Sequence, residues 1–230
     1  MAAFLVVVAR LAAVEPLADG KRKKMIRFSD QDRARITAAI HAAERNTSGE
    51  FVAVVARISD HYLFLPLLWA AVLALLLPGV FLLLSVPLAF TRIYQIQLLA
   101  FIILSLLLLL IPRLHLALIP RHIKMARASR LAKAQFYIQG VHLTRDHSGV
   151  LFFVSLAEHY VEIVADRGIH EKLGEAHWQA IVQTFIERVR AGEIVEGFVA
   201  SITACGEAMR THYPPDADAV DELSDGLVEI

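Results

Sequence analysis

Two long apolar runs in the middle of the chain dominate its hydrophobic pattern. Residues 63–90 contain no ionisable side chain, and after Thr91 and Arg92 the chain is uncharged again over residues 93–111. A helix needs about 20 apolar residues to cross a hydrocarbon core of about 30 Å, and each run is long enough. A helix on a soluble core usually keeps a polar face, which these runs lack. The pattern predicts a transmembrane helical hairpin, and the alternative is a pair of buried helices in a soluble protein.

The sequence on either side of this block alternates between helix and strand patterns. Ser29 and Asp32 form an approximate capping box before a helix that we expect to end near Asn46. Short runs rich in β-branched residues predict two buried strands, over residues 50–59 and 150–157, and an adjacent strand over residues 160–166. The last two are separated by two residues, which predicts an antiparallel pair. Apolar positions at helical spacing predict three further helices, over residues 122–139, 175–190 and 196–212.

This order of elements predicts an α/β fold, a small α/β/α sandwich interrupted by the two-helix transmembrane hairpin. The hairpin would follow the first strand, where a crossover helix otherwise begins. We expect the α/β domain over residues 26–61 and 121–213, and the hairpin insert over residues 62–120. The first 25 residues are predicted to be a weakly ordered tail, and residues 214–230 an acidic, flexible one.

Composition and charge narrow the classes of function. The chain has 230 residues, of which 57% are hydrophobic, and its formal net charge is zero. Because the chain has no excess of basic residues, it lacks the overall positive electrostatic field that is typical of nucleic-acid-binding proteins. The single cysteine, Cys205, excludes an internal disulfide framework and a cysteine-based zinc cluster.

Basic residues are concentrated after the hairpin, whereas the turn inside it offers only Arg92. Because positive residues gather in loops on the cytoplasmic side, both soluble segments are expected to be cytoplasmic. The same residues could lie against anionic headgroups of the lipid bilayer, and the alternative is a solvated basic face. They are Arg113, Arg121, Lys124, Arg127, Arg130 and Lys133.

Three carboxylates are the candidates for a divalent-cation site, with calcium as the example. Glu50 opens one predicted strand and Asp166 closes another, so they share an edge only if those strands run in opposite directions. Glu44 could approach the same edge, and hard cations prefer several oxygen ligands. The simpler interpretation, which we favour, is that Glu50 is a solvated charge and Asp166 caps a turn. The ten histidines show no zinc-binding spacing.

An ordered set of segments resembles the TPM domain, a family named for a phosphatase, a photosystem-repair protein and a receptor modulator. The resemblance is strongest to bacterial members with a paired transmembrane insert. The segments are Ala43-Glu44 with Thr47 to Val55, Ala132 to Phe136 with Gly140, Thr144 with Ser148 to Ser155, Glu162 to Ile169, the helix containing Trp178, Glu196-Gly197 with Ile202 and Gly206, and Asp221 to Leu223.

The resemblance implies a location in the bacterial inner membrane but leaves two functions open. Some relatives are phosphatases, some bind calcium, and others act in assembly or modulation. The first hypothesis is a non-catalytic interaction module that contacts other membrane or envelope proteins. The second is a metal-dependent, phosphatase-like hydrolase. Because the residues offer no convergent set of charged groups, they favour the first.

Overall fold

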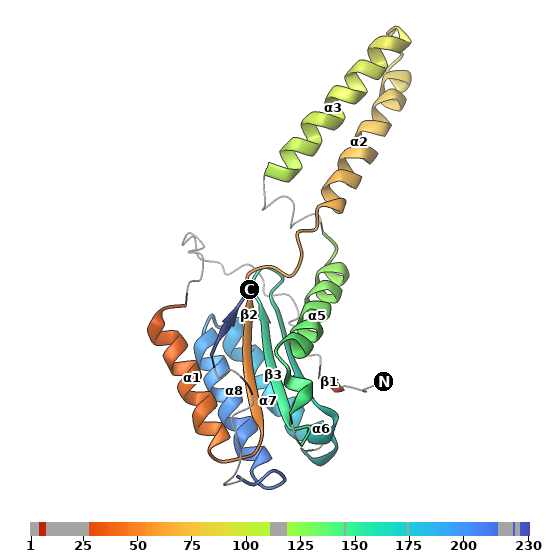
Figure 1. The fold of residues 1–230 in the computed structure, drawn as a ribbon. Helices are drawn as coiled ribbons and strands as arrows, with labels where there is room; N and C mark the ends of the chain where they lie inside the picture. The colour runs from red at the N-terminus through yellow and green to blue at the C-terminus, as the bar shows by residue number, and fades with distance from the viewer. Residues whose placement is uncertain are drawn as a thin grey trace. The chain divides into compact units, whose positions relative to one another are not determined.

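The structure is a computed structural model, and it describes residues 5–7, 28–110, 119–144, 146–173, 175–215, 223 and 226–230. The chain forms two compact units, one of Met1–Ser59 with Met125–Ile230 and the other of Asp60–Lys124. The elements, drawn in Figure 1, are β1 (Leu5–Val7), α1 (Asp30–Glu44), β2 (Glu50–Ala56), α2 (Phe64–Leu83), α3 (Phe90–Leu110), α5 (Arg121–Ile138), the 3-10 helix η1 (Val141–Leu143), β3 (Gly149–Ser155), β4 (Tyr160–Ala165), α6 (Arg167–Leu173), α7 (Glu175–Arg190), α8 (Ile194–Met209) and β5 (Val228–Glu229).

The first unit is built on one mixed sheet with the strand order β1-β4-β3-β2-β5. Strands β2 and β3 are parallel over seven residue pairs, from Glu50 opposite Gly149 to Ala56 opposite Ser155. Strand β4 runs antiparallel to both β3 and β1, and β5 runs parallel to β2. The antiparallel pair predicted from the sequence is therefore confirmed.

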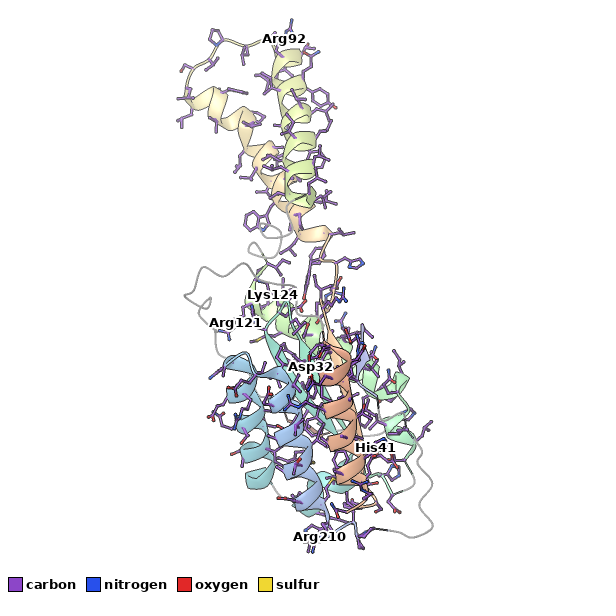
Figure 2. All side chains as sticks on the ribbon, turned by 90° about the vertical axis from the view of Figure 1, so that its left-hand side faces the viewer. Asp32, His41, Arg92, Arg121, Lys124 and Arg210 are labelled. Carbon is purple, nitrogen blue, oxygen red and sulfur yellow. The ribbon has the colours of Figure 1, made fainter. Side chains whose placement is uncertain are left out.

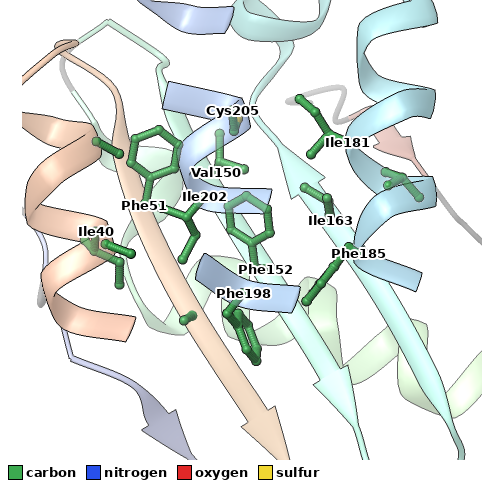
Figure 3. Close-up of a cluster of buried hydrophobic side chains, with 14 of the residues drawn as sticks. Ile40, Phe51, Val150, Phe152, Ile163, Ile181, Phe185, Phe198, Ile202 and Cys205 are labelled. Atoms are coloured by element: carbon green, nitrogen blue, oxygen red, sulfur yellow. The ribbon is translucent and has the colours of Figure 1, made fainter. Parts of the chain in front are cut away.

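Helices cover both faces of the sheet, which confirms the predicted α/β/α sandwich. On one face, alternate residues of β2, β3 and β4 pack with α1, α7 and α8 in a cluster that includes Ile40, Phe152, Phe185 and Cys205 (Figure 3). On the other face, the strands pack against α5. Because β3 is buried at every position, its sequence is a continuous apolar run without alternation.

Local chemistry explains where α1 begins. The Ser29 hydroxyl accepts a hydrogen bond from the Asp32 N–H at 3.1 Å, and the Asp32 carboxylate accepts one from the Ser29 N–H at 2.9 Å. This reciprocal pair is the predicted capping box. Asp32 and His41 lie near opposite ends of the helix (Figure 2), and the negative charge of Asp32 in the first turn suits the helix dipole.

Three parts of the unit, β1, β5 and α6, differ from the sequence expectations. Leu5–Val7, expected within a weakly ordered tail, forms β1, and Val228–Glu229, expected within a flexible tail, forms β5. Both are edge strands too short to show a periodic pattern. After Gly140, which adopts a φ of +74°, the residues Val141–Leu143 form the 3-10 helix η1. A short helix, α6, follows β4 where only a turn was expected.

The second unit contains the apolar helices α2 and α3, which pack against each other and are each long and apolar enough to cross a membrane. On α2, the side chains of Leu65, Pro66, Ala70 and Ala74 are buried. On α3, Ser105 and Leu108 are buried. Arg92 lies in the first turn of α3 (Figure 2).

We expect Phe152 to be central to the stability of the first unit. Its ring lies 6.4 Å from that of Phe51 and 5.8 Å from that of Phe185, measured between centroids. Phe152→Ala should lower the free energy of unfolding by about 3–5 kcal/mol, because the cavity is enclosed on all sides. The measurement is denaturant unfolding followed by the fluorescence of the buried Trp178, in a Trp69→Phe background.

Phe152→Leu serves as the matched control for this prediction and should cost markedly less. A loss of similar size for both variants would contradict the cavity explanation.

Candidate functional site

The candidate site lies at the edge of the sheet where β2 and β3 begin and β4 ends. Since β4 runs antiparallel to β3 and β2 runs parallel to it, Glu50 and Asp166 lie at this same edge. Gly149 lies between them: it pairs with Glu50 in the ladder, and its carbonyl accepts the Asp166 N–H at 3.1 Å. Two strand spacings separate the backbones of Glu50 and Asp166, a distance of about 10 Å.

Glu44 and Asp166, two of the three predicted carboxylates, make separate local contacts. An oxygen of Glu44 accepts the Phe51 N–H at 3.1 Å. One oxygen of Asp166 accepts the Arg167 N–H at 2.6 Å, and the other lies 3.1 Å from Nδ1 of His147. Among the described residues, no group of three or more histidine, cysteine, aspartate or glutamate side chains could hold a metal ion. The divalent-cation site at Glu44, Glu50 and Asp166 stays a prediction.

His147 is the polar residue at this edge that the sequence did not single out. It adopts a φ of +51°, and its ring is largely exposed while Asp166 is mostly buried. When Nδ1 carries the proton it donates to Asp166, and Nε2 is then an acceptor able to exchange a proton. Asp166 is 19 positions away, and only the pairing of β3 with β4 brings the two together.

Buried hydroxyl groups join the loops of this edge. The Thr47 hydroxyl donates to the carbonyl of Tyr213 at 2.6 Å, and the Ser148 hydroxyl donates to the carbonyl of Ser48 at 2.9 Å. A methyl group at Gly168 would approach the Tyr213 hydroxyl and the His147 carbonyl to 3.0 and 3.1 Å. The loops that carry His147 and Asp166 are therefore held in place by close packing.

Comparison with known proteins identifies the domain. Residues 116–208 match the family model described as the TPM domain. The chain carries a domain of the TPM family. The match includes α5, β3, β4 and α7, whereas α1 and β2 lie outside it and join the same sheet through the pairing of β2 with β3.

A solved structure shares this fold. The NMR structure of the BA42 protein from the psychrophilic bacterium Bizionia argentinensis is 18% identical, with a TM-score of 0.58 over 91% of this chain and 100% of that one. At this identity the likeness concerns the fold alone. No curated protein matches the chain.

A second polar cluster of the TPM domain lies at the opposite edge of the sheet, where β2 and β3 end. The hydroxyls of Ser59 and Ser155 are 2.8 Å apart, and the Ser155 hydroxyl also donates to the carboxylate of Glu158. The other oxygen of Glu158 accepts the Ser59 N–H at 2.9 Å. Ser155 and Glu158 are buried. The cluster fastens the end of β2 to the turn between β3 and β4.

The predicted basic residues are found along α5, except Arg113, which lies outside the described residues. The side chains of Ala128, Ala132 and Phe136 face the sheet at four-residue spacing. The basic residues are excluded from that buried stripe. Arg121, Arg130 and Lys133 are exposed, and Lys124 and Arg127 are partly exposed.

A buried carboxylate, Glu162, connects α5 to the sheet. It is fully buried on β4, where it accepts hydrogen bonds from the hydroxyls of Tyr160 at 2.8 Å and Ser129 at 3.2 Å. Burial raises the pKa of Glu162, and the two hydrogen bonds and the charge of Lys133 oppose that rise. The sequence signal for this residue is a single carboxylate inside an otherwise apolar strand.

We expect Glu162→Gln to change how stability depends on pH. Because the folded pKa is raised, the folded domain holds a proton that the unfolded chain has lost, and the free energy of unfolding falls as pH rises above the ordinary value of 4.5. Glutamine does not ionise, and its carbonyl oxygen can accept from one of the two hydroxyls while its amide N–H donates to the other, so the variant should lack this fall. The measurement is urea unfolding across a pH series upward from that value.

Glu207→Gln, which removes an exposed carboxylate from α8, is the matched control and should keep the wild-type profile. A fall of the same size in wild-type protein and Glu162→Gln would rule out Glu162 as its source.

Proposed function

We propose that this TPM-domain protein is anchored in a bacterial inner membrane and acts as a non-catalytic interaction or assembly module on its cytoplasmic face. The observation that carries the proposal is the outward-facing apolar surface of α2 and α3. Leu75, Leu82 and Leu83 are 71%, 82% and 85% exposed. An exposed surface of this kind is costly in water and is normal against lipid.

The lengths of the helices and their flanking charges agree with a membrane hairpin. Helices α2 and α3 contain 20 and 21 residues, and a helix of that length spans about 30 Å. Arg92 is at the turn, while Arg121, Lys124 and Arg127 follow the hairpin. The positive-inside rule supports a cytoplasmic location for the residues before and after it.

A reporter inserted after Arg92 tests this topology. We expect it to report the side away from the cytoplasm, because the turn carries a single basic residue. The matched control is the same reporter at Gly192, an exposed turn between α7 and α8 with open space around it, which should report the cytoplasm. A cytoplasmic signal at Arg92 would contradict the proposed orientation.

The contacts at the candidate site support an interaction role over catalysis. Glu44 and Asp166 accept backbone N–H groups, and buried hydroxyls bind the adjoining loops to one another. Such contacts hold loops in a fixed shape. The lipid bilayer and other membrane or envelope proteins are the proposed partners, with the exposed basic residues of α5 near anionic headgroups.

A phosphatase-like hydrolase is the second candidate, and the pair of His147 and Asp166 favours it. A carboxylate that orients a histidine is a common acid–base arrangement. A divalent cation would add the charge that stabilises a phosphoryl group in such a reaction.

An assay on a generic phosphate ester, with and without calcium, distinguishes the two functions. We expect no metal-dependent turnover by the purified chain. Asp146→Asn is the matched control for Asp166→Asn, because it removes an exposed carboxylate from the neighbouring turn. Turnover that survives Asp146→Asn and is abolished by Asp166→Asn would overturn the non-catalytic role.

A further inference from the structure

The outer edge of β2 is covered by the chain's own last residues. Strand β5 pairs with it in parallel, with Val228 opposite Val54 and Glu229 opposite Val55. The Ile230 N–H donates to the Val55 carbonyl at 3.0 Å, and the Arg57 N–H donates to the Ile230 carbonyl at 2.8 Å. The covering segment, residues 227–230, therefore lies along β2 as an extended peptide.

The side chains of this segment contact both faces of the sheet in alternation. Leu227 packs against the cluster under α1 and α8, and Val228 packs against the cluster under α5. Glu229 forms an ion pair with Arg33 of α1, with one carboxylate oxygen 2.8 Å from Nε and 2.7 Å from Nη2. Asp30 holds Nη1 of the same guanidinium at 2.9 Å, so an independent contact orients Arg33.

Two different devices protect this edge of β2. Near its start, the N–H of Phe51 is accepted by the Glu44 carboxylate. Near its end, Val55 and Arg57 are bonded to Ile230. Phe51, Val55 and Arg57 are odd-numbered, so their backbone N–H groups point to the same side of β2. That side is turned away from β3, because the N–H of the even-numbered Glu50 points the other way and donates to the Ser148 carbonyl. An uncovered edge is a template for another strand, and here a two-residue strand covers part of it.

We propose that this edge of β2 is a peptide-binding site for an extended segment of a partner protein, in which an acidic residue follows two apolar residues. Residues 227–230 occupy the site within the chain and compete with the partner. Backbone hydrogen bonds to Val55 and Arg57 would hold any extended segment, while Arg33 and the two apolar contacts select its side chains.

The small size of the internal contact makes exchange feasible. A two-residue strand with a partly exposed ion pair belongs to the part of a structure that opens most readily. Because residues 227–230 belong to the same chain as β2, their effective concentration at this edge is high. A partner peptide can displace them only if it is itself concentrated nearby or forms hydrogen bonds with more of β2 than they do. The inference rests on the interaction role proposed above and names its surface and class of partner.

Peptide binding by the full chain and by a variant lacking residues 226–230 tests the proposal. The probe is a fluorescent peptide with the sequence of residues 223–230, and the readout is fluorescence anisotropy in detergent micelles. We expect the shortened chain to bind the probe at least about tenfold more tightly than the full chain, because the internal competitor is gone. A probe with lysine in place of Glu229 should bind at least about tenfold more weakly.

Charge exchange tests the role of Arg33. In the shortened chain, the Arg33→Glu variant should no longer bind the original probe, and it should bind the probe that has lysine in place of Glu229. A second comparison uses Arg33→Gln, with Arg35→Gln as its matched control. Arg35 is on the same helix as Arg33, but it forms its ion pair with Glu196, at 2.9 Å. Arg35→Gln should leave probe binding unchanged, and Arg33→Gln should weaken it.

A second route does not depend on the shortened chain being folded. In the full chain, Arg33→Glu should speed hydrogen exchange at the Arg57 and Ile230 amides, and adding Glu229→Lys should reverse the effect.

Three outcomes would overturn the proposal. The first is that a folded shortened chain does not bind the probe, and the second is that both chains bind it equally. The third is that the full chain forms dimers that exchange residues 226–230, because the partner would then be a second copy of this chain. None of these three outcomes contradicts the proposed interaction role. Metal-dependent turnover in the phosphate-ester assay would contradict that role but would not change the result of the peptide-binding experiment.

Discussion

The parallel pairing of β2 with β3 is the constraint on which the rest of the structure depends. Two parallel strands cannot be joined by a tight turn, so the chain between them must cross one face of the sheet. Helix α5 makes that crossing, and its small residues Ala128 and Ala132 let it lie close to the strands. The apolar hairpin is placed within the same connection, so one α/β domain is completed by sequence on both sides of it.

The direction of the strands also determines which polar groups meet. Because β4 returns antiparallel to β3, the end of β4 lies at the same edge of the sheet as the start of β2, with β3 between them, and Asp166 comes beside His147. At the other edge the same arrangement brings Ser59 to Glu158. The polar chemistry of the domain is thus divided between two edges, and the interior between them contains the single carboxylate of Glu162 among the described residues.

Much of this fold could be predicted from sequence where a pattern is long. Helix α7 has the predicted bounds of residues 175–190, and the capping box at Ser29 forms as its spacing indicated. The edge strands β1 and β5 were missed because three and two residues carry no period. Val228 and Glu229 become a strand only by lying against β2. For the candidate site, whether Glu50 and Asp166 share an edge depends on the relative direction of their strands. The contact between Asp166 and His147 depends on the register of β3 with β4. Both are properties of the assembled sheet, so the sequence pattern alone could not predict them.

The place of the hairpin within the crossover has a consequence for the order in which the protein is made. Strand β2 ends at Ala56 and β3 begins at Gly149, so the longest ladder of the sheet cannot form until more than ninety further residues have been synthesised. During that interval α2 and α3 leave the ribosome while β2, apolar at every position after Glu50, can be covered on one face by α1. Completion of the domain therefore has to wait for the hairpin, and a delay in placing the hairpin would prolong the exposure of a bare strand.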